Sequence, residues 1–237
     1  MSLLKIENID TGYDKKQVLF DVSLEIEQGE TILLVGGNGS GKSTLLKAVY
    51  GLLPLWNGNI YYDNKLIQTA NSKLNLQHHS TLIARHLVYI PQKNQLFADM
   101  SVIENLRMSL LHLNDKEETE NRVAQLLDEM PILKNRYRQT ADQLSGGEAK
   151  LLSLGMAMVN RPKLLLFDEP LAGLSGKNIS TVLQYIEQLK QSGITLVLVE
   201  HKIKELFAYA DRIIGLKLGY LHTENIDTLD NIKTFMI

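Results

Sequence analysis

The chain has 237 residues, of which 44% are hydrophobic and 22% charged, so it can bury a substantial core as one large domain or two small ones. Its 25 basic and 27 acidic residues give a formal net charge of −2, which offers no overall footprint for nucleic acid, and the absence of cysteine excludes disulfides, thiolate zinc sites and thiol catalysis. No segment approaches the roughly 18 apolar residues of a membrane span and the N-terminus lacks a secretory pattern, so we expect a cytosolic protein unless a partner brings it to a membrane.

Two segments near the N-terminus, residues 2–9 and 18–27, alternate apolar and polar positions. A period of two is typical of strands with one exposed face, and it predicts an antiparallel β region here. Tyr13 follows the first segment, after Gly12. An aromatic residue in such a place is ordinarily part of a core, so this pattern alone assigns it no function.

A glycine-rich loop lies between a strand predicted over residues 31–35 and a helix predicted over residues 42–50. It fits the pattern G-x-x-x-x-G-K-[ST], in which glycines let backbone N–H groups turn towards an anion and the lysine adds a positive charge. The N-terminus of the helix also favours negative charge, because its N–H groups are unpaired. We therefore expect nucleotide phosphates to bind at Gly36, Gly37, Asn38, Gly39, Ser40, Gly41, Lys42, Ser43 and Thr44.

Apolar runs separated by helical segments predict four more strands, over residues 86–90, 163–168, 194–199 and 212–217. Strands that alternate with helices form a mainly parallel sheet, so the fold class is α/β with helices flanking the sheet. Asp168 and Glu169 end the second of these strands. Because ligands bind at the carboxyl ends of strands in open α/β sheets, we expect this acidic pair at the nucleotide. We interpret the paired His78 and His79 as an exposed turn.

Between Gln92 and Leu144 the sequence becomes helical in character. Ser101 and Glu104 have capping-box spacing, and residues 115–130 form a charged amphipathic stretch that ends before Pro131. A second capping box, Ser145 with Glu148, begins a helix predicted over residues 147–159. Helix capping alone is one complete explanation of this second motif.

Taken in order, these motifs resemble the ATP-binding cassette (ABC) ATPases over the whole chain. The residues Leu144-Ser145-Gly146-Gly147-Glu148 are similar to the motif that defines that family, and Lys163 to Pro170 resembles its Walker B element. The resemblance implies a P-loop NTPase core with an N-terminal antiparallel β region and an inserted helical subdomain. It divides the single domain, residues 1–237, into a core of 1–92 and 160–237 and a helical subdomain of about 93–159.

The resemblance also implies roles in ATP hydrolysis, where the protein positions groups and stabilises charge on the γ-phosphate. Glu169 would polarise the attacking water, His201 would touch the γ-phosphate, and Gln92 would lie near the water and Mg²⁺. Ser43 and Asp168 would hold Mg²⁺ together with Gln92, with a water between the ion and Asp168. Tyr13 would stack on adenine, because stacking requires only a π-face.

In the family that this chain resembles, the residues Ser145, Gly146, Gly147 and Glu148 contact the nucleotide of the opposite subunit. The resemblance therefore implies a homodimer, or a heterodimer with another ATP-binding subunit, that drives transmembrane permease subunits from the cytoplasmic face of the membrane. Residues 97–106, 144–156 and 171–175 are similar to those of branched-chain amino-acid importer ATPase subunits.

Two positions depart from the family pattern. Glu148 stands where the motif usually has Gln, and Ser175 stands where the loop after the acidic pair commonly has Asp. A soluble ABC ATPase of metal-cluster assembly is the alternative to a transport subunit, whereas the short spacing from Lys42 to Ser145 disfavours chromosome-maintenance members. An intact Glu169 and His201 disfavour a non-catalytic nucleotide sensor.

Overall fold

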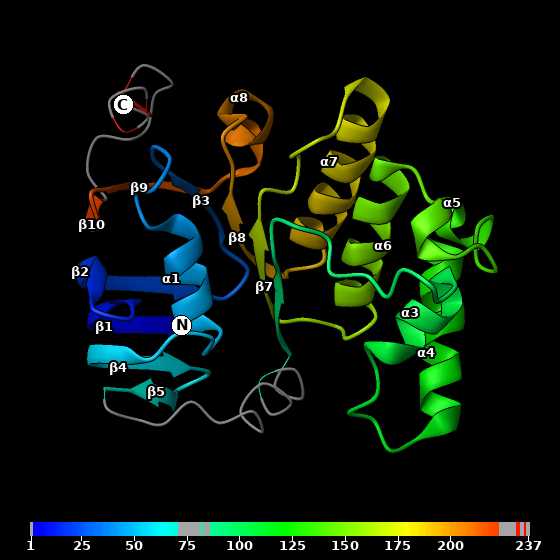
Figure 1. Cartoon of the computed structure of the whole chain (residues 1–237), viewed down its shortest axis with the longest axis horizontal. Helices are drawn as coiled ribbons and strands as arrows, with labels where there is room; N and C mark the ends of the chain where they lie inside the picture. The colour runs from blue at the N-terminus through cyan, green and yellow to red at the C-terminus, as the bar shows by residue number, and fades with distance from the viewer. Residues whose placement is uncertain (1, 71–81, 83–85, 223–230, 233–234, 236–237) are drawn as a thin grey trace.

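The computed structural model describes residues 2–70, 82, 86–222, 231–232 and 235. His78 and His79, predicted as an exposed turn, lie outside the described residues. The chain forms two β-sheets and a helical region; Figure 1 shows one sheet at the lower left, the other running from the upper left to the centre, and most of the helices at the right.

The first sheet is antiparallel and has the strand order β2-β1-β4-β5. Its strands are β1 (Ser2–Tyr13), β2 (Lys16–Glu27), β4 (Leu55–Tyr62) and β5 (Lys65–Thr69). The alternating pattern of β1 and β2 buries one face of this sheet, as the sequence predicts. The structure extends β1 to Tyr13, so this residue lies at the end of a strand beside the phosphate loop.

The second sheet has six strands in the order β10-β9-β3-β8-β7-β6. All neighbouring pairs are parallel except β9 and β10, which confirms the mainly parallel sheet. The strands are β3 (Thr31–Val35), β6 (Leu87–Ile90), β7 (Leu164–Asp168), β8 (Thr195–Val199), β9 (Arg212–Lys217) and β10 (Tyr220–His222). The predicted strands agree with β3, β6, β7, β8 and β9 to within one residue at each end.

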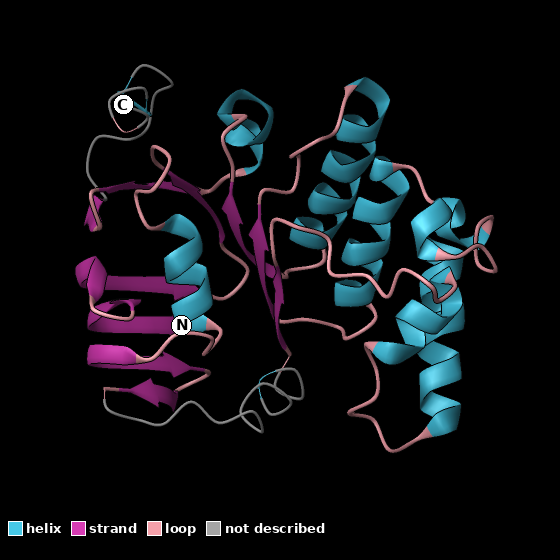
Figure 2. Ribbon diagram, in the orientation of Figure 1, coloured by secondary structure: helices cyan, strands magenta, loops and turns pink. Residues whose placement is uncertain are grey.

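Helices surround this second sheet, and Figure 2 shows them in cyan against the magenta strands. They are α1 (Lys42–Val49), α3 (Val102–Met108), α4 (Lys116–Glu129), α5 (Pro131–Lys134), α6 (Gly146–Met158), α7 (Gly176–Gln191) and α8 (Ile203–Leu206), with 3₁₀ turns at Ala141–Gln143 and Phe207–Tyr209. Both predicted capping boxes are present, at Ser101 and at Ser145.

Two hydrophobic cores lie on opposite faces of the central strands, because successive side chains of a strand point to opposite faces. Leu165 and Phe167 of β7 pack in a core with α3, α4, α6 and α7, whereas Leu164 and Leu166 pack in a core with α1 and the antiparallel sheet. The continuous apolar run of β7 is therefore explained by burial on both faces. This buried strand ends at Asp168, the first residue of the acidic pair.

The strands β4, β5 and β10 were not anticipated from sequence. β4 contains Asn57, Gly58 and Asn59, residue types that are depleted in strands, and Gly58 has a φ of 81°. A Cβ at Gly58 would lie 2.2 Å from the carbonyl oxygen of Glu7, so the close approach of β1 requires glycine. Among the described residues, no helix is long and apolar enough to cross a membrane.

Candidate functional site

The glycine-rich loop joins β3 to α1 and is packed tightly against its neighbours. A Cβ at Gly36 would lie 2.2 Å from the carbonyl oxygen of Leu216 in β9, and Gly41 has a φ of 110°, which a side chain would strain. The N–H of Gly37 donates to the carbonyl of Phe235 at 2.7 Å. The loop therefore has a fixed form that glycine makes possible.

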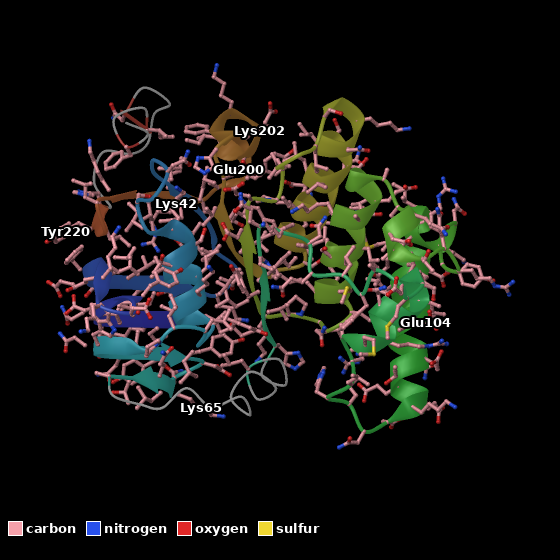
Figure 3. All side chains as sticks on the ribbon, viewed as in Figure 1. Lys42, Lys65, Glu104, Glu200, Lys202 and Tyr220 are labelled. Atoms are coloured by element: carbon pink, nitrogen blue, oxygen red, sulfur yellow. The ribbon has the colours of Figure 1, made fainter. Side chains whose placement is uncertain are left out.

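Lys42 is buried at the start of α1, and Figure 3 shows it near Glu200 in this view. Its ammonium donates to the carbonyls of Gly36 at 2.7 Å and Gly37 at 2.9 Å. Burial lowers the pKa of Lys42, and the charges of Asp168 and Glu169 oppose this shift. The loop thus holds a cation beside the acidic pair.

Asp168 ends β7 with its carboxylate buried next to α1. Burial raises its pKa, whereas hydrogen bonding to Ser43 and to Tyr89 lowers it. The Tyr89 hydroxyl donates to Oδ2 at 3.4 Å, and among the described residues Oδ1 lacks a hydrogen-bond partner. Hard cations such as Mg²⁺ are bound by oxygen ligands, so a buried carboxylate oxygen without a hydrogen-bond partner suits a magnesium site.

Glu169, Gln92 and His201 come together from three different strand ends. The Gln92 amide donates to Oε2 of Glu169 at 2.7 Å, and Nε2 of His201 lies 3.4 Å from Oε1. Glu169 has a φ of 51°, a conformation that is unusual for a residue with a side chain. Its N–H donates to the carbonyl of Val199 at 2.8 Å, which fixes this turn to β8.

A pocket of about 460 Å³ lies over the loop and contains most of the predicted site residues. It is lined by Tyr13, Lys16, Val18, Asn38, Gly39, Gly41, Lys42, Ser43, Thr44, Gln92, Glu169 and His201. Tyr13 lies at its edge, with the Lys47 ammonium 5.7 Å from the ring centroid. Sequence reasoning missed Lys16 and Val18; their place at the start of the strand after Tyr13 was the available signal.

The start of α6 lies outside this lining, within the part of the chain that the structure describes. Ser145 and Gly146 are exposed there, and the Ser145 hydroxyl accepts the Glu148 N–H at 3.3 Å. Gly147 is buried, and a Cβ on it would lie 2.5 Å from the Asn178 side chain of α7. The exposed start of α6 thus lies outside the pocket lining of its own chain, and its Ser145 and Glu148 N–H groups are bonded within the capping box.

The structure shows the contacts of Glu148 and the place of Ser175, the two departures from the family pattern. The carboxylate of Glu148 accepts from the Ser145 N–H at 2.9 Å and lies 3.0 Å from Nε of Arg136, and these contacts lower its pKa. Arg136 therefore offsets the charge that Glu148 introduces at this helix start. Ser175 precedes α7 without making a side-chain cap.

The model of the ABC transporter family matches residues 19–172. The chain is 35% identical over 233 residues to the high-affinity branched-chain amino acid transport ATP-binding protein BraG of Pseudomonas aeruginosa, covering 98% of this chain and 97% of that protein. It is 33% identical to the lipopolysaccharide export system ATP-binding protein LptB of Escherichia coli K12, over 93% of this chain and 89% of that protein.

Solved structures give the same result. A nucleotide-free ATP-binding cassette from an ABC transporter has a TM-score of 0.82 at 27% identity, covering 99% of this chain and 95% of that one. A dimeric cassette in a post-hydrolysis state with ADP and Pi bound has a TM-score of 0.79 at 26% identity, covering 94% of this chain and 99% of that one. The fold predicted from the motifs is thereby confirmed.

Proposed function

The chain belongs to the ABC transporter family, as an ATP-hydrolysing subunit of the transport-coupled kind, and from this premise we propose how its residues do the work. The contact of Glu169 with Gln92 and His201 beside the phosphate loop carries the proposal, because it joins a general base to a γ-phosphate site. The soluble cluster-assembly alternative is disfavoured, because the relatives named above are transport proteins.

In this proposal the phosphates of ATP enter the pocket over the loop. Lys42 binds the β- and γ-phosphates, and the backbone N–H groups from Gly39 to Thr44 hold the α- and β-phosphates at the start of α1. Tyr13 stacks on adenine at the pocket edge. Glu169 orients the attacking water, while His201 contacts the γ-phosphate and Gln92 orients the Glu169 carboxylate.

We assign Mg²⁺ to Ser43, Asp168 and Gln92, with a water between the ion and Asp168, because the Asp168 carboxylate interacts with Ser43 and its buried Oδ1 lacks a hydrogen-bond partner among the described residues. Held by these residues, Mg²⁺ would supply positive charge to neutralise the phosphates of bound ATP.

Two chains would form the complete active sites. The start of α6, where Ser145 and Gly146 are exposed and lie outside the pocket lining of their own chain, suits the γ-phosphate bound to a second chain, because a helix N-terminus favours anions. The dimeric cassette found among the similar structures supports such an arrangement. The partner is a second copy of this chain or another ATP-binding subunit.

We assign residues 93–159 to a helical subdomain that contacts transmembrane permease subunits, and residues 1–92 and 160–237 to the catalytic core. An apolar groove of about 350 Å³ lies where the two parts meet. Its lining includes Val88 and Ile90 of β6, Met108 and Leu111 near α3, and Met156 of α6. Docking of a permease there would place the chain on the cytoplasmic face of the membrane.

Lys42→Ala is expected to weaken ATP binding by at least about tenfold, because it removes the cation held inside the phosphate loop. Titration with a fluorescent ATP analogue measures the affinity. Lys163→Ala is a matched control, since Lys163 is exposed and both it and its ion-pair partner Asp63 lie outside the pocket lining. Equal ATP affinity of Lys42→Ala and the wild type would remove Lys42 from the site.

Leu111→Glu is expected to prevent co-purification with permease subunits while leaving ATP binding intact. Leu111 is 68% exposed at the groove, so the change places a charge where apolar contact is needed and costs the fold little. Co-expression with multi-span permease subunits of ABC transporters provides the measurement. Leu218→Glu, at an equally exposed leucine on another face, serves as the control. Undiminished co-purification of Leu111→Glu would exclude the groove as the docking site.

A further inference from the structure

Four charged side chains are buried among the residues that the structure describes. Lys42 and Asp168 belong to the nucleotide site, whereas Lys150 and Glu200 are each only 2% exposed and are not in the pocket lining. Burying a charge is costly unless polar partners compensate for the lost water, so each of these two groups needs a reason to be there. Their partners are backbone atoms of the catalytic segments.

Lys150 extends from α6 towards the ends of β6 and β7. Its ammonium donates to the carbonyl of Gln92 at 3.3 Å and to the carbonyl of Glu169 at 3.4 Å, and it lies 5.7 Å from the ring centroid of Phe167. Gln92 and Glu169 are also joined through their side chains. One cation therefore holds the backbone of both residues whose side chains meet beside the phosphate loop.

Glu200 makes a corresponding set of contacts at the end of β8. Its Oε1 accepts the N–H groups of His201 at 2.8 Å and Lys202 at 3.1 Å, and its Oε2 accepts the N–H of Leu171 at 2.8 Å. The carboxylate thus joins the backbone at His201 to the segment that follows Glu169. Figure 3 shows Glu200 between Lys42 and Lys202 at this edge of the sheet.

Lys202 strengthens the same connection from outside. Its ammonium donates to the carbonyls of Leu171 at 3.4 Å and Leu174 at 3.1 Å. The segment after Glu169 is therefore held to the His201 segment by both a carboxylate and an ammonium group. Burial lowers the pKa of Lys150, and the negative charge of Glu200 opposes this shift.

We propose that Lys150 and Glu200 are positioning residues for ATP hydrolysis, holding the backbone of Gln92, Glu169 and His201 so that their side chains converge. This inference rests on the roles proposed above for those three residues. Glu169 has a left-handed backbone with φ 51°, a conformation that persists only where neighbours hold it, and its carbonyl is one of the two that Lys150 contacts.

The position of Lys150 on α6 also relates it to the proposed contact with the second chain. The first turn of α6 is the part proposed to contact the nucleotide of the second chain, and Lys150 lies one turn further along the same helix. A shift of α6 when the second nucleotide arrives would move the ammonium that holds Glu169 and Gln92. In such a dimer, Lys150 would link the contact of its α6 with the partner's nucleotide to Gln92 and Glu169 of its own chain.

The test uses steady-state phosphate release and ATP affinity of the full chain for Lys150→Met, Lys150→Gln and Glu200→Gln. Met keeps the shape of Lys but removes all donors, so kcat should fall at least about tenfold while the KM and Kd for ATP stay within about twofold. Gln restores a donor and should recover kcat to within about threefold of the wild type. Glu200→Gln presents an amide donor to backbone N–H groups and should lower kcat by a similar factor at unchanged affinity.

A matched control separates positioning from stability. Leu154 is fully buried on α6 and is neither in the pocket lining nor in contact with Gln92 or Glu169, so Leu154→Ala should lower Tm but keep kcat per ATP-binding chain. The amount of ATP bound at saturation gives the folded fraction of each sample. A loss of kcat that is equal in Lys150→Met, Lys150→Gln and Leu154→Ala would show a role in stability only and would overturn the inference.

Glu169→Gln, measured beside these variants, keeps the two proposals apart. If Glu169→Gln still turns over ATP, the role of Glu169 fails irrespective of Lys150. If Glu169→Gln is inactive but Lys150→Met and Glu200→Gln keep kcat within about twofold of the wild type, positioning by the buried charges is refuted. If Lys150→Met does not fold, Lys150→Gln takes its place in the test. A loss of kcat of about tenfold in Lys150→Gln at full ATP affinity would mean that a donor at this position does not restore hydrolysis, and it would overturn the proposed role.

Discussion

Replacing Glu169 with Gln is expected to abolish ATP turnover while leaving ATP binding intact. Glu169 stands 15% exposed between Gln92 and His201, and an amide there can still accept from Gln92 and face the ring of His201. The shape of the site is therefore kept, but the basic oxygen that orients water is lost. Removing such a group typically lowers kcat about tenfold to a hundredfold or more.

The measurement is steady-state phosphate release, with ATP affinity determined in parallel. Glu187→Gln is the matched control, because it makes the same substitution on α7, where Glu187 contacts only Gln191 among the interactions described. Phosphate release by Glu169→Gln above about a tenth of the wild-type rate would contradict the role of Glu169.

The Glu169→Gln protein is expected to dimerise in Mg-ATP and to shift towards monomer in ADP, which lacks the γ-phosphate that the second chain contacts. Adding Ser145→Arg should abolish this dimer, because it places bulk and positive charge where an exposed hydroxyl meets phosphate. ATP binding by the single chain should remain nearly unchanged, since Ser145 lies outside its pocket lining. Sedimentation of each protein with ATP and with ADP measures the change in size.

The Ser145 hydroxyl also caps α6, so the loss of a cap needs its own control. Ser101 has the same capping box with Glu104 at the start of α3, and Ser101→Ala removes a cap at a cost of about 0.5–2 kcal/mol. The Ser101→Ala, Glu169→Gln protein should still dimerise in ATP. Dimers that persist equally with ATP and ADP, with or without Arg at position 145, would exclude the start of α6 as the nucleotide-controlled interface.

The phosphate loop and the central strands could be predicted closely, because their signals are local. The glycines and Lys42 occupy fixed positions between a buried strand and a helix, and the structure has β3 and α1 where the pattern indicates them. The capping boxes at Ser101 and Ser145 were equally clear, since each depends on a spacing of three residues.

The features that the sequence did not predict depend on contacts between segments that are distant in the chain. β4 was missed because Gly58 and its asparagine neighbours are poor strand formers, and pairing with β1 overrides that preference. Lys150 resembles an ordinary helical lysine in the sequence, and only the fold brings it to the carbonyls of Gln92 and Glu169. The contact of Arg136 with Glu148 likewise depends on the turn between α5 and α6.

The tight packing of the phosphate loop has a consequence for the energetics of the cycle. The close approach of Gly36 to Leu216 and the contacts of Gly37 and Lys42 fix the loop without help from a nucleotide. A preorganised site loses little conformational entropy when its ligand arrives, so more of the intrinsic binding free energy of ATP is retained. In the proposed dimer, that retained free energy would be available to stabilise the contact of a second chain with the γ-phosphate.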